Sequence, residues 1–134
     1  MSKHFNMISI DGIDKSGKGI LFQYLKHMNN YQYALLDRGP ISNYMFAKFY
    51  NREFNFDLSS FSNVLFIVLS VKYEDWLIRC KISNELKIDY DLHCRLYKNA
   101  IKDFESSGCT VLQYNTTQKT PFNIAKDVID FLSL

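Results

Sequence analysis

The chain has 134 residues and a formal net charge of +2, with 47% hydrophobic and 22% charged residues. These values are typical of one soluble globular domain spanning residues 1–134 and argue against a disordered protein. The nearly balanced charge also argues against a protein that coats nucleic acid, so we expect no nucleic-acid partner.

The cysteines and the N-terminal residues indicate the cellular compartment in which the protein is expected. Cys80, Cys94 and Cys109 form no C-x-x-C pair and have no histidine close enough in sequence to indicate a zinc site. The segment MSKHFNMISI lacks the apolar region of a signal peptide, and no run reaches the roughly 20 apolar residues of a membrane span. We therefore expect a cytoplasmic protein with reduced thiols and no membrane association.

Four short apolar runs are predicted to be strands, at 5–10, 33–37, 63–71 and 109–114. The third, NVLFIVLSV, is continuously apolar, which is typical of a strand buried on both faces. Because helical patterns separate these runs, each pair of strands needs a crossover connection. The pattern predicts an α/β fold in which a parallel sheet lies between two layers of helices.

The predicted helices lie between and after the strands, at about 18–29, 41–51, 73–82 and 89–106, with a last one after Thr120. Thr120 followed by Pro121 is a helix-start signal, because threonine caps a helix and proline fits its first turn. Residues 51–62 form the least regular connection.

The segment between the first strand and the first helix has the spacing of a phosphate-binding loop, G-x-x-x-x-G-K, from Gly12 to Lys18. Glycines let the backbone curl so that N–H groups and the helix N-terminus face an anion. The alternative is a strand-to-helix turn that only uses glycine. The residues expected to contact the donor nucleotide are Gly12, Asp14, Lys15, Ser16, Gly17, Lys18, Gly19 and Ile20.

The stretch DGIDKSGKG resembles the thymidylate kinase family, whose loop reads close to E-G-x-D-x-x-G-K-[ST]. The internal Asp14 carries the resemblance, because phosphate loops in general need no acid there. In that family the acid faces the bound monophosphate, and Lys15 stands where one subclass has arginine. The resemblance implies a P-loop kinase fold and binding of ATP and Mg²⁺.

The second strand ends in Asp37-Arg38, followed by Ser42 and Phe46 on the next helix, which resembles the [DE]-R segment of the same kinases. The resemblance implies that Asp37 organises Mg²⁺ through a water ligand and that Arg38 holds the transferring phosphoryl group. It also implies that Ser42 and Phe46 position the acceptor, with Phe46 stacking on the base. The alternative is a surface ion pair beside a core phenylalanine.

The segment from 64 to 81 resembles the family's approach to its lid, which makes Arg79 and Lys81 candidates for closing over the phosphates. A solvated basic helix end is the alternative.

Arg95 and Tyr97 lie in a helix that resembles the one contacting the acceptor base. Residues 115–121 resemble the loop around adenine, and the lid at 82–89 is short. The scattered His4, His27 and His93 are expected to be structural or surface residues.

Two departures from the family pattern bear on function. Gly19 replaces the Ser or Thr that is a direct Mg²⁺ ligand in GTPase-like loops, although adenylate-kinase-type enzymes also read G-K-G. A strand and helix of the family are missing between Asn30 and Tyr33, leaving four strands in the order 2-1-3-4. Either residues 44–56 rebuild the acceptor pocket, or a second subunit completes it as a homodimer, or the acceptor specificity has changed or been lost.

The sequence therefore predicts a small ATP-dependent nucleoside monophosphate kinase, with Lys18, Arg38, Asp37, Lys15 and Arg79 as catalytic residues. The acceptor is expected to contact Asp14, Arg38, Ser42, Phe46 and Tyr97. Two alternatives stay open: a nucleotide-binding protein without catalysis, and a kinase of a nucleoside or a polynucleotide end.

Overall fold

The computed structural model describes residues 4–29, 32–83 and 88–133, and its centre is a four-stranded sheet. The strands are parallel and lie in the order β2-β1-β3-β4, as predicted. Their bounds are β1 (Met7–Gly12), β2 (Ala34–Asp37), β3 (Val64–Ser70) and β4 (Thr110–Asn115). Each strand begins one or two residues later than its apolar run.

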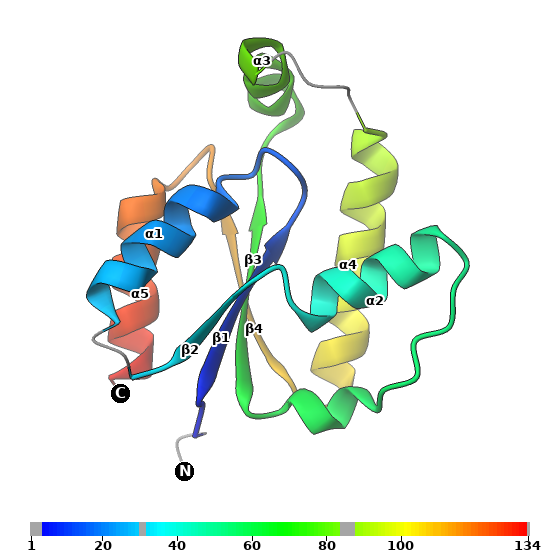
Figure 1. The fold of residues 1–134 in the computed structure, drawn as a ribbon. Coiled ribbons are helices and arrows are strands. Elements are labelled where there is room, and N and C mark those ends of the chain that lie inside the picture. The colour runs from blue at the N-terminus through cyan, green and yellow to red at the C-terminus, as the bar shows by residue number, and fades with distance from the viewer. Residues whose placement is uncertain (1–3, 30–31, 84–87, 134) are drawn as a thin grey trace.

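The described residues form five α-helices, and the sheet lies between two helical layers (Figure 1). They are α1 (Lys18–Met28), α2 (Pro40–Phe49), α3 (Tyr73–Ser83), α4 (Tyr90–Ser106) and α5 (Pro121–Leu132). Figure 1 shows α1 and α5 on one face of the sheet, α2 and α4 on the other, and α3 beyond the carboxyl ends of the strands. The irregular connection at 51–62 contains a short 3₁₀ helix, η1 (Leu58–Phe61).

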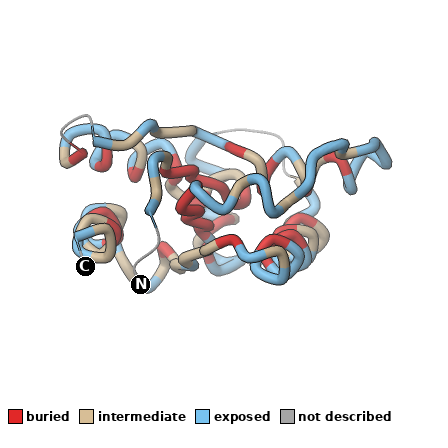
Figure 2. Tube along the Cα trace, turned by 90° about the horizontal axis from the view of Figure 1, so that it is seen from below, coloured by how far each residue is buried: buried red, intermediate tan, exposed pale blue. Residues whose placement is uncertain are grey.

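The core has two halves because β3 is buried on both faces, with six consecutive buried residues from Val64 to Leu69. Leu65 and Ile67 pack with Leu21, Leu25 and others against α1 and α5. Phe66 and Val68 belong to the cluster that packs against α2 and α4. Figure 2, seen from below, shows the buried positions concentrated along the central strands and the inner sides of the helices.

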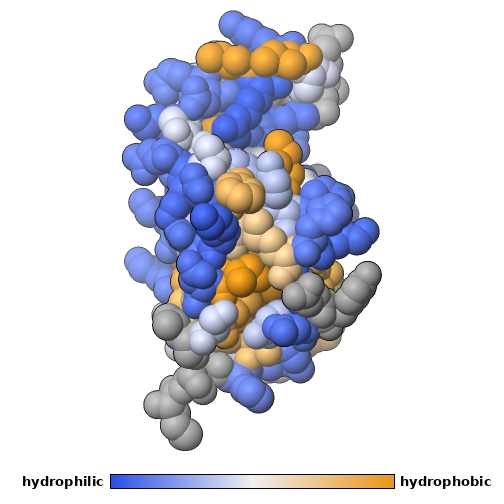
Figure 3. Space-filling view, turned by 90° about the vertical axis from the view of Figure 1, so that its left-hand side faces the viewer, coloured by the Kyte–Doolittle hydropathy of each residue, from blue (hydrophilic) through white to orange (hydrophobic). Residues whose placement is uncertain are grey.

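Helix α3 is attached to the domain by one face only. Trp76 and Cys80 are buried on that face, whereas Ile78 and Ile82 are 54% and 81% exposed. Figure 3 shows an apolar band at the top of the domain, the end at which α3 lies. Within the described part of the chain, no helix combines the length and apolar character needed to cross a bilayer.

All four strands end at the edge of the sheet nearest α3, as Figure 1 shows. The connections that follow β1, β2 and β3 are therefore brought together there, together with the turn after β4. In parallel sheets this edge is where ligands usually bind, because the loops after the strands converge. The predicted phosphate loop and Arg38 lie in these connections, and the other predicted site residues lie on the adjoining strands and helices.

Candidate functional site

The connection between β1 and α1 follows a backbone path that needs glycine. Gly12 and Gly17 have φ values of 139° and 98°, and Lys15 has a φ of 64°. A Cβ on Gly12 would lie 2.3 Å from the carbonyl oxygen of Leu69, so only glycine fits against β3 there. The result is a tight curl over the end of β1, the backbone form of an anion-binding loop.

The curl leads directly into the N-terminus of α1. Its N-cap residue is Gly17, which supplies no side-chain hydrogen bond to the first turn. The first backbone N–H groups of a helix have no partner within the helix, and the helix dipole adds partial positive charge. This end of α1 is therefore suited to hold phosphate oxygens.

Lys18 lies inside this curl. Its side chain is buried, and Nζ donates a hydrogen bond to the Ile13 carbonyl oxygen at 2.8 Å. Burial, and then the nearby charge of Arg38, lowers the pKa of Lys18 to about 8. An anion that enters the loop would stabilise the protonated, charged form of Lys18.

A cavity of ≈ 330 Å³ opens beside the loop, here called the loop cavity. It brings together eight residues, all predicted to be in the site: Asp14, Lys15, Gly17, Lys18, Gly19, Ile20, Asp37 and Arg38. Ser16 lies outside this lining and is fully buried, and its hydroxyl has no hydrogen-bond partner among the described residues.

The Asp37-Arg38 pair turns the chain from β2 into α2. Asp37 is the last residue of β2, and Arg38 takes up a left-handed backbone conformation with φ of 65°. The Arg38 guanidinium lies 3.7 Å from the Asp14 carboxylate, and both side chains are about half exposed, at 45% and 41%. Arg38 therefore pairs with the phosphate loop and not with its neighbour Asp37.

Asp11 fixes the start of α2 from the neighbouring strand. Its buried carboxylate accepts hydrogen bonds from the backbone N–H groups of Gly39 and Ser42, both at 2.9 Å. The hydroxyl of Ser9 donates to the other oxygen at 2.8 Å. Asp11 thus supplies the N-terminal cap that α2 lacks in its own sequence and so positions Arg38.

We expect the substitution Asp11→Ala to destabilise the protein by about 1–3 kcal/mol, because it leaves two buried N–H groups without an acceptor. Urea unfolding of the variant measures this change. The exposed Asp130, changed to Ala, is the matched control and should leave the free energy of unfolding nearly unchanged. Equal stability of the two variants would contradict the capping role.

A second cavity of ≈ 310 Å³, here called the aromatic cavity, adjoins the loop cavity. Its lining comes from β1, the phosphate loop, α2 and α4: Gly12, Asp14, Arg38, Phe46, Phe49, Tyr50, Ile88, Asp89, His93 and Tyr97. Asp14 and Arg38 belong to both cavities, so the two spaces meet at this ion pair.

The rings in this cavity pack mostly edge to face. His93 lies 4.9 Å from Phe49 and 5.9 Å from Phe46, measured between ring centroids. The ring of Tyr50 is stacked over Phe46 at 6.2 Å and remains 55% exposed. Arg38 reaches the Phe46 ring, with 6.0 Å between the guanidinium carbon and the centroid. The cavity therefore offers aromatic surface to a flat ligand and a cation at one end.

Ser42 and Tyr97 lie deeper than the sequence suggested. Ser42 is 1% exposed, and its hydroxyl is 3.0 Å from that of Tyr97. Tyr97 lines the aromatic cavity, whereas Ser42 is absent from both linings. Burial raises the pKa of Tyr97 to about 12, so its phenol is neutral near pH 7 and shares a hydrogen bond with the Ser42 hydroxyl.

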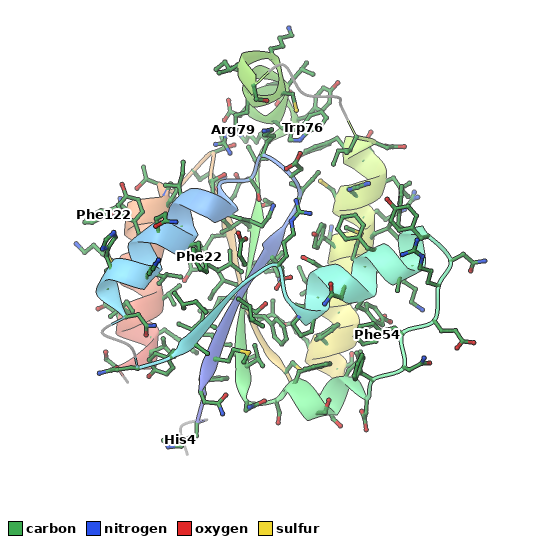
Figure 4. The ribbon with its side chains drawn as sticks, in the orientation of Figure 1. His4, Phe22, Phe54, Trp76, Arg79 and Phe122 are labelled. Carbon is green, nitrogen blue, oxygen red and sulfur yellow. The ribbon has the colours of Figure 1, made fainter. Side chains whose placement is uncertain are left out.

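Arg79 fastens α3 to the phosphate loop. Its guanidinium donates to the Lys15 carbonyl oxygen at 2.8 Å and to the Thr116 hydroxyl at 3.1 Å. Figure 4 shows Arg79 between α3 and the connections below it. Thr116 belongs to the predicted adenine loop, which packs beside Gly17. Arg79 thus ties two site loops together, while Lys81 is exposed and lines neither cavity.

Some aromatic residues of segment 44–56 line the aromatic cavity, and others pack elsewhere in the domain. Phe46, Phe49 and Tyr50 line the cavity, whereas Tyr44 packs edge to face with Phe54 and with Phe104 of α4. Figure 4 shows Phe54 far from Arg79, towards the other end of the domain. Arg95 is exposed outside both cavities, and four residues of the predicted lid, 84–87, lie outside the described residues.

The sequence interpretation missed Asp89 and His93. His93 was expected to be structural or at the surface; it is buried and packs against Phe46 and Phe49, and it also lines the aromatic cavity. Asp89, His93 and Tyr97 follow each other at intervals of four, so they share one face of α4 and its cap. This spacing is the sequence signal that could have grouped them.

The comparisons with known proteins give one structural match to report. The crystal structure of YorR protein from Bacillus subtilis, in complex with phosphorylated GDP, superimposes with a TM-score of 0.78. The alignment covers 96% of this chain and 96% of that chain, at 18% sequence identity. No protein-family model and no curated protein sequence matches the chain. The likeness establishes a shared fold.

Proposed function

We propose that the protein is a nucleoside monophosphate kinase, thymidylate-kinase-like in its motifs, which transfers the γ-phosphoryl group of ATP to a (deoxy)nucleoside monophosphate. The observation that carries the proposal is the junction of two cavities at Arg38 and Asp14. One cavity has the donors of a phosphate loop and the other has aromatic walls. The structural likeness to YorR, which was crystallised with phosphorylated GDP, supports nucleotide binding.

In the proposed reaction the loop amides and Lys18 hold the β- and γ-phosphates of ATP, and residues 115–121 lie beside the adenine. The monophosphate places its base in the aromatic cavity and its phosphate next to Arg38. An oxygen of that phosphate attacks the γ-phosphorus, the bond to the β–γ bridging oxygen breaks, and ADP leaves. Arg38, Lys15 and Lys18 stabilise the charge that spreads over the transferred group.

The residues at the loop cavity fit a hydrated Mg²⁺. Asp37 is a carboxylate at the end of β2 and lines the loop cavity, whereas Gly19 offers no hydroxyl. Mg²⁺ often keeps several waters and uses one or two carboxylates together with substrate phosphates. When bound, it neutralises charge on the β- and γ-phosphates, and Asp37 would hold it through water. Arg79 supports this arrangement by keeping the Lys15 backbone in place.

Transfer is tested with γ-labelled ATP, Mg²⁺ and a panel of nucleoside monophosphates, including deoxythymidine and deoxyguanosine monophosphate. We expect labelled diphosphate from at least one acceptor and unlabelled ADP in equal amount. Failure to label any acceptor would overturn the proposal. The missing hydroxyl at Gly19 favours one alternative, a nucleotide-binding protein without catalysis, and binding without transfer would support it.

A hydroxyl at position 19 should increase the affinity of the site for Mg²⁺. A Cβ on Gly19 meets no heavy atom within 4 Å, so serine fits there without displacing its neighbours. We expect Gly19→Ser to lower the Mg²⁺ concentration that gives half-maximal transfer, because the hydroxyl adds a metal ligand. Gly19→Ala is the control for backbone effects. Equal Mg²⁺ dependence of the Ser and Ala variants would contradict this prediction.

Nucleotide affinity should fall as the pH rises through the pKa of Lys18. Burial lowers that pKa to about 8, so the free protein loses the ammonium charge above this pH. A bound phosphate favours the charged form, and affinity for ADP should fall by up to about tenfold per pH unit above the pKa. Calorimetric titrations without Mg²⁺ at about pH 7 and about pH 9 measure the change.

The variant Lys18→Met is the control for this pH dependence and should show a much smaller fall. A parallel fall in both proteins would assign the effect to another group. The pH dependence of stability has the opposite sign, since Lys18 in the unfolded chain keeps its proton up to its ordinary pKa of 10.5. The contribution of Lys18 to stability therefore increases as the pH rises from about 8 towards that value.

A further inference from the structure

We infer that the aromatic cavity selects a base with an exocyclic amine, guanine foremost, and discriminates against thymine, with Asp89 as the specificity-determining residue. The inference rests on the proposed function, because it concerns the acceptor of the same site. It concerns the hydrogen-bonding groups on the cavity wall and not the phosphate loop.

The polar groups of the cavity are divided between two regions. Arg38 and Asp14 form an ion pair where the aromatic cavity meets the loop cavity, which suits the phosphate end of a nucleotide. The remaining walls carry Phe46, Phe49 and Tyr50 together with the carboxylate of Asp89 and the imidazole of His93. A base stacked on these rings would present its edge to Asp89 and His93.

Asp89 keeps acceptor capacity for a ligand. It is the N-cap residue of α4, and its Oδ1 accepts one hydrogen bond from the Leu92 N–H at 3.1 Å. An ionised carboxylate has about four lone-pair positions on two oxygens, so one cap bond leaves most of them for other donors. The cap also holds the side chain in one place beside the cavity.

His93 does not supply a positive charge beside this carboxylate. Burial lowers the pKa of His93, and the opposing attraction of Asp89 and then Asp14 is weaker. The imidazole is therefore neutral near pH 7, with one donor and one acceptor. Among the residues that line the cavity, Arg38 is the one cation, and it is paired with Asp14.

A carboxylate accepts hydrogen bonds and cannot donate them, so it favours bases whose edges carry hydrogen-bond donors. Guanine presents an N1–H and an exocyclic amine side by side, which match two carboxylate oxygens. Adenine and cytosine each present one amine. Thymine flanks its single N–H with two carbonyl oxygens, which a carboxylate repels. Two well-formed bonds to a base edge discriminate by about tenfold to a hundredfold.

The test compares the dissociation constants of deoxyguanosine and deoxythymidine monophosphate by calorimetry, together with kcat/KM for transfer from ATP. The variant Asp89→Asn keeps a good N-cap residue but turns part of the group into a donor. We expect the wild type to favour deoxyguanosine monophosphate by at least about tenfold, and the variant to lose most of that preference. Asp91→Asn, at an exposed position of α4, is the charge-matched control and should not change it.

Asp89→Ser is a second variant that retains a capping side chain and removes the carboxylate. A wild-type preference for deoxythymidine monophosphate, or a preference that neither Asp89 variant changes, would overturn the inference while transfer itself stands. If no monophosphate is phosphorylated, the proposed function fails, and the binding ratio still decides the base selection. If no monophosphate binds, both are overturned.

Discussion

Replacing Lys18 with methionine should lower kcat for phosphoryl transfer by at least about a hundredfold. The ammonium is held within the loop by its bond to the Ile13 carbonyl oxygen and can exchange that partner for a phosphate oxygen without leaving the site. Methionine fills similar space but brings no charge, so the developing charge on the transferred group loses its nearest buried cation. Steady-state kinetics with the best acceptor of the panel measure the loss.

The matched control is Lys26→Met, which removes an exposed cation from the last turn of the same helix. It should leave kcat within about twofold of the wild type, since an exposed charge there is screened by solvent. A Lys18 variant that keeps wild-type kcat, or a Lys26 variant that loses as much, would contradict the role given to the loop.

Replacing Gly12 with alanine should destabilise the fold by on the order of 3 kcal/mol or more. The added Cβ would lie 2.3 Å from the Leu69 carbonyl oxygen, a backbone atom of the central strand. The φ of 139° at this position adds backbone strain for any other residue. Because small domains are stable by only about 5–15 kcal/mol, this is a large fraction of the total. Urea unfolding measures the change.

Gly19→Ala is the control for this experiment, because it adds the same methyl group seven residues later in the same segment. The added Cβ meets open space within the first turn of α1, so the variant should be neutral or gain up to about 1 kcal/mol. Similar unfolding curves for the two alanine variants would show that the close approach of Gly12 to β3 does not constrain the loop.

Most of the fold could be predicted because the physical signals are local. The six buried residues of β3 are continuous in the sequence, and Thr120-Pro121 starts α5, with the Thr120 hydroxyl accepting from the Asn123 N–H as a cap. The strand order β2-β1-β3-β4 was inferred from the family resemblance and is confirmed. The short 3₁₀ helix at Leu58–Phe61 carries no strong periodic signal and was predicted as irregular.

The parts of the site that could not be predicted depend on contacts between distant segments. Asp11 caps a helix that begins 29 residues later, through its bonds to Gly39 and Ser42. Arg79 reaches Lys15 across 64 residues of chain. Spacing within a motif holds no information about these long-range contacts, because the order of the strands and the paths of the connections determine them. Six of the eight predicted loop residues line the loop cavity together, all except Gly12 and Ser16, since the loop is one continuous segment.

We propose that the two cavities hold two nucleotides, and a crystal structure with ADP and deoxyguanosine monophosphate bound together tests this arrangement. We expect the ADP phosphates on the amides of residues 14–19, with adenine beside residues 115–121. We expect the monophosphate base among Phe46, Phe49 and His93, with its phosphate at Arg38. A single nucleotide that places its base in the aromatic cavity and its own phosphates on the loop would contradict binding of two nucleotides.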